Sequence, residues 1–334
     1  MTPKQRVMAR LAGKPVDRIP NFNILMMFAA RYIGRGMDEF CRDHRIMVAG
    51  NMRANEDFGI DLLNTMSDAY RETADYGAPI RFPLDSLPVC EHLIKGPHDI
   101  HKLKAFHPEE RTRMLDRVKA IECYKREGGE HWPIMGWVEG CAAESADLMG
   151  LTDYIMAIYD EPEMVREMMD ICLETACNCV RAQVQAGADI IGVGDAVASV
   201  MGPTIYREWV LDYQRRIFDE IHHCGAIGRL HICGDITLLL DDLRTCGADI
   251  IDIDWMVDFK AARDKLKGAA MVCGNFNPVS ILLDGTPEIV HSAVNDCVEA
   301  GGDDCIIMAG CEVPRDTPYE NLRAVAEALG DIGL

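Results

Sequence analysis

A histidine and two cysteines at the ends of apolar segments are well suited to metal chemistry. His231 and Cys233 stand two positions apart in GRLHICGD, where an apolar run ends. In a strand, residues two apart point to the same face, so this imidazole and thiol project together. Cys311 ends the last apolar run, and the three residues predict a His/Cys/Cys site with one open position, which is typical of catalytic zinc. Cys273, in AAMVCGN, is a competing ligand, although core packing is favoured for it.

Acidic side chains end several other apolar runs. Glu139 ends WPIMGWVEG, and Asp195 follows GVG at the end of the fourth run. Asp252 and Asp254 end the sixth run, two positions apart. Carboxylates at such places act as metal ligands, as general acids or bases, or as helix N-caps. Glu139, Asp195 and Asp254 are therefore the candidate catalytic residues, with capping as the alternative for each.

Eight apolar runs recur along the chain, separated by longer stretches that include helical periodicity. The runs lie at 19–26, 59–66, 132–140, 188–196, 227–234, 248–254, 269–276 and 304–310. Continuous apolar runs that alternate with helices predict parallel strands covered by helices. Eight such units predict a (β/α)₈ barrel, with a doubly wound sheet as the alternative. In a barrel the active site lies at the C-terminal ends of the strands, where the residues named above fall.

The sequence predicts one domain over residues 1–334, because no linker, charge block or low-complexity tract divides it. The segment 79–110 contains five prolines and is predicted to be an irregular excursion after the second strand. The oligomeric state stays open, with a homodimer as one option.

Charge and composition exclude several classes of partner. The chain has 54 acidic and 34 basic residues, a formal net charge of −20 with histidine neutral, which argues against nucleic acid and anionic membranes. We find no secretion signal and no apolar run long enough to span a bilayer, so we expect a cytoplasmic protein. Its 14 cysteines are then expected to be packed thiols or metal ligands rather than disulfides.

Several motifs resemble the uroporphyrinogen decarboxylase superfamily, in the same order along the chain. They are HICGD (231–235), GADIIDIDW (247–255), GNFNP (274–278) and AGCEVPRDTPYENL (309–322). The resemblance runs from about residue 3 to the end, and it implies one (β/α)₈ barrel with its cleft at the C-terminal ends of the strands.

The chain departs from true decarboxylases at two motifs. Their arginine-rich motif, which grips propionate carboxylates, corresponds to MMFAARYIG (26–34), where only Arg31 and Tyr32 remain recognisable. Decarboxylases also carry a histidine in the last strand-end loop, where this chain has Cys311. Both differences argue against decarboxylase chemistry.

The same region is similar to methylcobamide:coenzyme M methyltransferases and related corrinoid-dependent methyltransferases. Those enzymes hold zinc with an H-x-C motif and a distant second cysteine, and here 77 residues lie between Cys233 and Cys311. The segment GWVEGCAAESADLMG (136–150) also resembles that branch. The resemblance implies a corrinoid as co-substrate, carried by a partner protein, and an acidic fourth zinc ligand. Asp254 is the nearest match for this ligand, and Asp252 is the alternative.

Three functions follow from these observations. The first is zinc-dependent methyl transfer between a corrinoid protein and a thiol such as coenzyme M. In the second, the methyl donor is a methoxy or methylamine-type compound, and Glu139 and Asp195 are the candidates for handling the proton of the leaving oxygen. The third is metal-free decarboxylation of a porphyrinogen.

Overall fold

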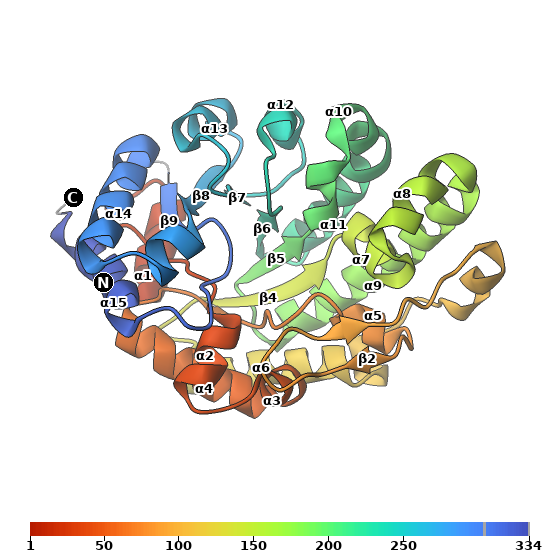
Figure 1. The fold of residues 1–334 in the computed structure, drawn as a ribbon, viewed down its shortest axis with the longest axis horizontal. Helices are drawn as coiled ribbons and strands as arrows, with labels where there is room; N and C mark the ends of the chain where they lie inside the picture. The colour runs from red at the N-terminus through yellow and green to blue at the C-terminus, as the bar shows by residue number, and fades with distance from the viewer. Residues whose placement is uncertain (303–304, 333–334) are drawn as a thin grey trace.

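Seven parallel strands form one continuous sheet in the computed structural model of this chain, which describes residues 1–302 and 305–332 (Figure 1). Their order in the sheet is the order in which they follow one another along the chain. The strands are β1 (Leu63–Asn64), β4 (Ile134–Glu139), β5 (Ile190–Gly194), β6 (Ile227–His231), β7 (Ile250–Asp252), β8 (Met271–Phe276) and β9 (Cys305–Ala309).

Helices connect the strands and cover the outside of the sheet (Figure 1). The predicted helical stretch before the fourth apolar run forms α9, which has Pro162 in its first turn and ends where Gly187 adopts a left-handed φ of 116°. The helices are α1 (Pro3–Leu11), α2 (Met26–Tyr32), α3 (Met37–Arg42), α4 (His44–Phe58), α5 (Arg71–Asp75), α6 (Arg113–Glu127), α7 (Cys141–Met149), α8 (Leu151–Asp160), α9 (Pro162–Ala186), α10 (Gly202–Ile205), α11 (Leu211–His223), α12 (Leu240–Leu243), α13 (Phe259–Leu266), α14 (Pro287–Gly301) and α15 (Tyr319–Asp331).

The first predicted strand closes the sheet into a barrel, but it is not a regular strand. Asn21 forms a parallel bridge with Ile307 of β9, and the amide of Asp61, just before β1, donates to the carbonyl of Asn21 (2.9 Å). Side chains replace part of the usual ladder, because the Asn21 amide donates to Asp61 Oδ2 (2.8 Å) and the Ala309 amide to Asn23 Oδ1 (2.9 Å). The predicted (β/α)₈ arrangement is confirmed, and the doubly wound alternative is excluded.

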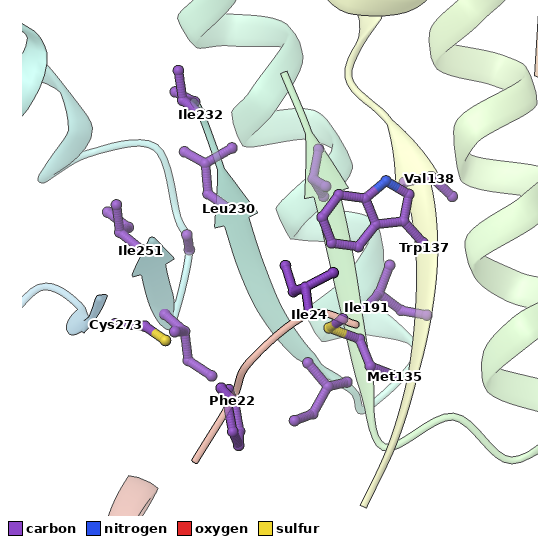
Figure 2. Close-up of a cluster of buried hydrophobic side chains, with 14 of the residues drawn as sticks. Phe22, Ile24, Met135, Trp137, Val138, Ile191, Leu230, Ile232, Ile251 and Cys273 are labelled. Atoms are coloured by element: carbon purple, nitrogen blue, oxygen red, sulfur yellow. The ribbon is translucent and has the colours of Figure 1, made fainter. Parts of the chain in front are cut away.

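Large side chains fill the inside of the barrel. Arg229 of β6 is fully buried and lies over the ring of Phe22 (5.2 Å to the ring centroid). Figure 2 shows Met135 and Trp137 of β4 pointing toward Ile24, while Val138 lies on the other face of the strand. The barrel interior is therefore a packed core, and a cavity opens at the C-terminal ends of the strands.

The segment 79–110 leaves the barrel after α5. It contains a short antiparallel pair, β2 (Ile80–Arg81) and β3 (Val89–Cys90), followed by 3₁₀ turns at Pro97–Lys102 and Pro108–Glu110. The turn between the two strands brings Leu87 and Pro88 to the barrel mouth. Within the described residues, no helix is both long enough and apolar enough to cross a membrane.

Candidate metal centre and its cavity

His231, Cys233 and Cys311 meet at the C-terminal mouth of the barrel. His231 is the last residue of β6, Cys233 follows it by two positions, and Cys311 follows β9. His231 Nε2 lies 3.0 Å from Cys233 Sγ and 4.0 Å from Cys311 Sγ, and the two sulfurs are 3.5 Å apart. Strands β6 and β9 are not neighbours in the sheet, so the curvature of the barrel is what brings these ligands together.

A buried chain of polar side chains fixes the imidazole of His231. Its Nδ1 lies 2.7 Å from Asp252 Oδ2, and Arg229 Nε donates to Asp252 Oδ1 (2.9 Å). Burial alone would raise the pKa of Asp252, but Arg229 and His231 hold it below its usual value. Because the carboxylate occupies Nδ1, the other ring nitrogen, Nε2, is the one that faces the two thiols. Metal-ligating histidines are commonly oriented by a carboxylate in this way.

The two thiols differ in acidity because they share a hydrogen bond. The hydrogen bond from Cys233 and the contact with His231 lower the pKa of Cys311 to about 4, in spite of burial. The same hydrogen bond raises the pKa of Cys233, and burial adds to the rise. A site that already favours a thiolate beside an imidazole is suited to a cation.

The donor set fits a zinc ion. The three ligand atoms lie within 4.8 Å of one another, and one imidazole with two cysteine sulfurs is a ligand set that zinc takes in catalytic sites. Among residues 1–302 and 305–332, this is the one group of three or more such side chains that converges in this way.

A cavity of about 290 Å³ opens beside the three metal-ligand candidates. Its wall combines apolar and aromatic side chains with carboxylates. It is lined by Ile24, Met26, Met66, Asp68, Ala69, Tyr70, Leu87, Pro88, Trp137, Glu139, Gly194, Ala196, His231, Cys233, Cys311 and Glu312. The residues come from many strand ends and from the segment 79–110, as expected for an active site on a barrel.

Two glycines of β5 make room for the cavity wall. A Cβ at Gly192 would stand 2.3 Å from the Trp137 ring, and one at Gly194 would stand 2.7 Å from Glu139 Oε2. The Gly-Val-Gly sequence at 192–194 is therefore explained by the close approach of these two β4 side chains rather than by nucleotide binding.

Glu139, a predicted catalytic residue, lies in the cavity wall. Its Oε1 accepts from Arg71 Nη2 (2.5 Å) and from Trp137 Nε1 (3.1 Å). Burial raises the pKa of Glu139 to about 7, with Arg71 opposing the rise and Glu72 adding to it. A carboxyl group that titrates near neutrality in a cavity is suited to general acid–base work.

Asp254 lies next to the metal-ligand candidates but outside the group of three. One of its carboxylate oxygens accepts from the Gly234 amide and the other from the Trp255 amide, each at 2.7 Å. Each carboxylate oxygen therefore already accepts one amide hydrogen bond, and Asp254 is not part of the converging group. Its predicted role as fourth ligand stays a prediction.

Asp195 has the contacts of a helix cap. It is fully buried and accepts from the amide of Ala143, in the first turn of α7, and from Gln214 Nε2 (2.8 Å). It does not line the cavity. These contacts favour the capping alternative, and the predicted catalytic role of Asp195 has no direct support among them.

Replacing Asp195 by asparagine tests the buried environment of this carboxyl group. Burial raises the pKa of Asp195 to about 6, so its contribution to stability is present below the unfolded value of 3.8 and is lost as the pH rises through about 6. We expect the free energy of unfolding of the wild type, relative to the variant, to fall by about 3 kcal/mol between pH 4 and pH 7. Urea denaturation across this range measures the difference.

The exposed Asp264 provides the matched control. Its pKa is already below that range, so Asp264→Asn should show a constant difference from the wild type. A constant difference for Asp195→Asn as well would contradict the buried environment that raises the pKa of this carboxyl group.

Cys273 lies in β8 with no exposed surface, and it is not one of the converging ligands. Figure 2 places it among the buried apolar side chains. Packing, the favoured explanation, agrees with this position.

Three charged residues near the cavity were not singled out from the sequence. Glu312 lines it directly after Cys311, Asp68 lines it two residues after the second apolar run, and Arg71 lies buried behind Glu139. Burial and the neighbouring Cys311 raise the pKa of Glu312 to about 7. Their positions after strand ends could have drawn attention to them. Loop residues have no regular periodicity, however, so the sequence does not predict which way their side chains point.

The fold and site together define a (β/α)₈ barrel in which His231, Cys233 and Cys311 converge at the mouth. The chain belongs to the uroporphyrinogen decarboxylase (URO-D) family, whose profile matches residues 2–332. A structure described as a methyltransferase from Methanosarcina mazei covers 99% of both chains with a TM-score of 0.91 at 22% identity, which agrees in fold.

The curated relatives divide between the two branches considered above. The chain is 28% identical to a methylcobamide:CoM methyltransferase of Methanosarcina acetivorans, over 98% of this chain and 97% of that protein. It is 25% identical to another of Methanosarcina barkeri, with the same coverage. It is 24% identical to a uroporphyrinogen decarboxylase of Carboxydothermus hydrogenoformans, over 92% and 91%. The predicted resemblance to the corrinoid-dependent branch is confirmed, and with it the predicted class of enzyme.

Proposed function

We propose that this protein is a zinc-dependent enzyme that moves a methyl group between a corrinoid and a thiol. The observation that carries the proposal is the convergence of His231, Cys233 and Cys311 on one side of the cavity at the barrel mouth. The chain is similar over nearly its full length to methyltransferases named for the same pair of substrates, and this similarity supports the proposal.

The chain's own residues would prepare the thiol for reaction. Zinc held by the three ligands would lower the pKa of a bound thiol and keep its sulfur as a thiolate. Asp252 fixes the ligand histidine, and the apolar wall formed by Trp137 and Ile24 excludes water from the sulfur. The thiol sulfur forms the new carbon–sulfur bond, and the electron pair of the broken carbon–cobalt bond leaves with the corrinoid.

The barrel mouth offers a surface for a protein that carries the corrinoid. Large apolar side chains stay exposed in the loops that follow β5 to β8. They are Val200 (60% exposed), Leu238 (75%), Trp255 (49%), Met256 (46%) and Val279 (50%). Exposed apolar groups on the face that contains the cavity suit a protein partner better than free solvent.

In a second candidate function, a small molecule donates the methyl group and the corrinoid accepts it. Glu139 lines the cavity with a pKa raised to about 7, so it could protonate the oxygen of a methoxy donor as its methyl group leaves. Porphyrinogen decarboxylation has no comparable support. Arg31, which remains from the arginine motif, is 48% exposed, pairs with Asp316 (3.5 Å), and does not line the cavity.

Methyl transfer from free methylcobalamin tests the proposal. We expect the zinc-loaded protein to consume methylcobalamin in the presence of a small thiol, under exclusion of air, at least about 100-fold faster than the metal-free protein. Absorbance follows the corrinoid, and mass spectrometry identifies the methyl thioether. No reaction with any thiol, together with methylation of reduced cobalamin by a methoxy compound, would favour the second function.

A further inference from the structure

The cavity wall presents carboxyl groups where a substrate would lie against it. Asp68, Glu139 and Glu312 are the charged side chains of the wall apart from the metal-ligand candidates. Among the residues that the structure describes, no lysine or arginine lines the cavity. A sulfonate or carboxylate group in this space would therefore meet carboxylates and would lack the arginine or lysine partner that usually binds such an anion.

The nearest guanidinium groups lie behind the wall, and one nitrogen of each is bonded to a wall carboxylate, while Arg71 Nε and Arg113 Nε and Nη1 are buried without a partner among the described residues. Arg71 is fully buried and donates to Glu139 Oε1 (2.5 Å). Arg113 is 7% exposed and donates to Asp68 Oδ2 (2.6 Å). In both pairs the carboxylate faces the cavity and the guanidinium stands outside it. Turning either arginine toward a substrate would break a buried ion pair, which costs several kcal/mol.

Glu312 adds a carboxyl group that has no cation of its own. Within residues 1–302 and 305–332, no ion pair and no side-chain hydrogen bond joins it to another residue. It is half-buried and follows Cys311 directly, so it lies on the cavity side of the proposed metal centre.

The uncharged part of the wall is compatible with a cationic or neutral group. Trp137 and Tyr70 contribute aromatic rings, and Met26 and Met66 contribute thioethers. Aromatic faces attract ammonium groups, and flexible thioether side chains adapt to small apolar ones. Of these four side chains, the two thioethers offer no hydrogen-bond donor and Trp137 Nε1 already donates to Glu139, which leaves the Tyr70 hydroxyl as the donor that an anion could use.

We infer that the thiol used by this enzyme carries no negative charge on its body, and that a neutral or ammonium-bearing thiol is preferred to a sulfonate or carboxylate. The inference rests on the proposed function and specifies its substrate class. It sets this chain apart from its relatives named for coenzyme M, which is a sulfonate.

Three thiols with the same two-carbon skeleton test the preference. Cysteamine carries an ammonium group, 2-mercaptoethanol a hydroxyl group, and coenzyme M a sulfonate. Calorimetric titration of the zinc-loaded protein gives the affinity for each, and the methylcobalamin assay gives kcat/KM. We expect cysteamine and 2-mercaptoethanol to exceed coenzyme M by at least about tenfold in both. Equal or better use of coenzyme M would overturn the inference while leaving thiol methylation intact. Failure of all three thiols to bind would overturn both.

Variants separate the effect of charge from the intrinsic acidity of the thiols. Glu312→Gln should narrow the ratio of cysteamine to coenzyme M affinity by about three- to tenfold, and Glu139→Gln should act in the same direction. Zinc content and circular dichroism confirm that each variant is loaded and folded. Glu109→Gln, on an exposed 3₁₀ turn, is the matched control and should leave the ratio unchanged. An unchanged ratio in both cavity variants would contradict the charge argument.

Discussion

Replacing Cys233 or Cys311 by alanine should remove nearly all zinc from the protein and reduce methyl transfer at least about 1000-fold. Each variant keeps only two of the three converging donors, and two donors hold zinc weakly against water. The barrel should still fold, because both cysteines lie at its mouth and outside the buried core. Elemental analysis of the purified variants and the methylcobalamin assay measure the two effects.

Cys273→Ala is the appropriate control for these variants. This variant makes the same cysteine-to-alanine change, but it removes a thiol from the packed interior of β8 instead of from the barrel mouth. Its zinc content should equal that of the wild type, while its stability falls modestly through the loss of a buried side chain. Zinc at the wild-type level in both Cys233→Ala and Cys311→Ala would show that the metal, if bound, is held elsewhere.

Replacing Asp252 by alanine should have the largest effect on stability. Arg229 is fully buried and bonds to this carboxylate, so the variant leaves an uncompensated charge inside the barrel. Removing one partner of a buried pair costs about 3–5 kcal/mol. His231 also loses the acceptor of its Nδ1, and loss of such a partner lowers metal affinity about 10- to 100-fold. Urea denaturation and competition with a chelator measure these effects separately.

A double variant distinguishes the two roles of Asp252. Arg229→Met combined with Asp252→Ala removes both charges and should regain most of the lost stability, because apolar replacement of a whole buried pair is nearly neutral. Its zinc affinity should stay low, since the imidazole of His231 is still unsupported. Full recovery of zinc affinity in the double variant would mean that Asp252 acts on the metal site only through stability. Asp264→Ala, at an exposed ion pair, should change neither quantity.

The convergence of His231, Cys233 and Cys311 could be predicted from the sequence because two simple rules apply to these residues. Residues two apart in a strand share a face, and the chain keeps Cys233 beside His231 although β6 ends at His231. The C-terminal ends of barrel strands share one rim, which adds Cys311 although two strands separate β6 from β9. Neither rule depends on the details of side-chain packing.

The roles of the acidic residues could not be predicted in the same way. The strand-end rule finds Glu139, Asp195 and Asp254 alike, but only packing decides what each carboxylate meets. Glu139 meets Arg71 in the cavity wall, Asp195 meets the first turn of α7, and Asp254 meets two backbone amides. The wall itself depends on space left by Gly192 and Gly194, which a sequence pattern does not reveal.

The segment around Asn21, which closes the barrel without forming a regular strand, has a consequence for how the chain folds. The residues around Asn21 pair with β9, and the amide of Ala309 bonds to Asn23 across a sequence separation of 286 residues. During synthesis, the residues around Asn21 can bond to Asp61 early, but their partners on β9 become available only after β9 itself has been made. Contacts between such distant residues are slow to form, since a long loop must close before they contribute. Completion of the barrel is thus a late event in folding, and the cavity, whose wall includes Ile24 and Cys311, comes into existence only with that event.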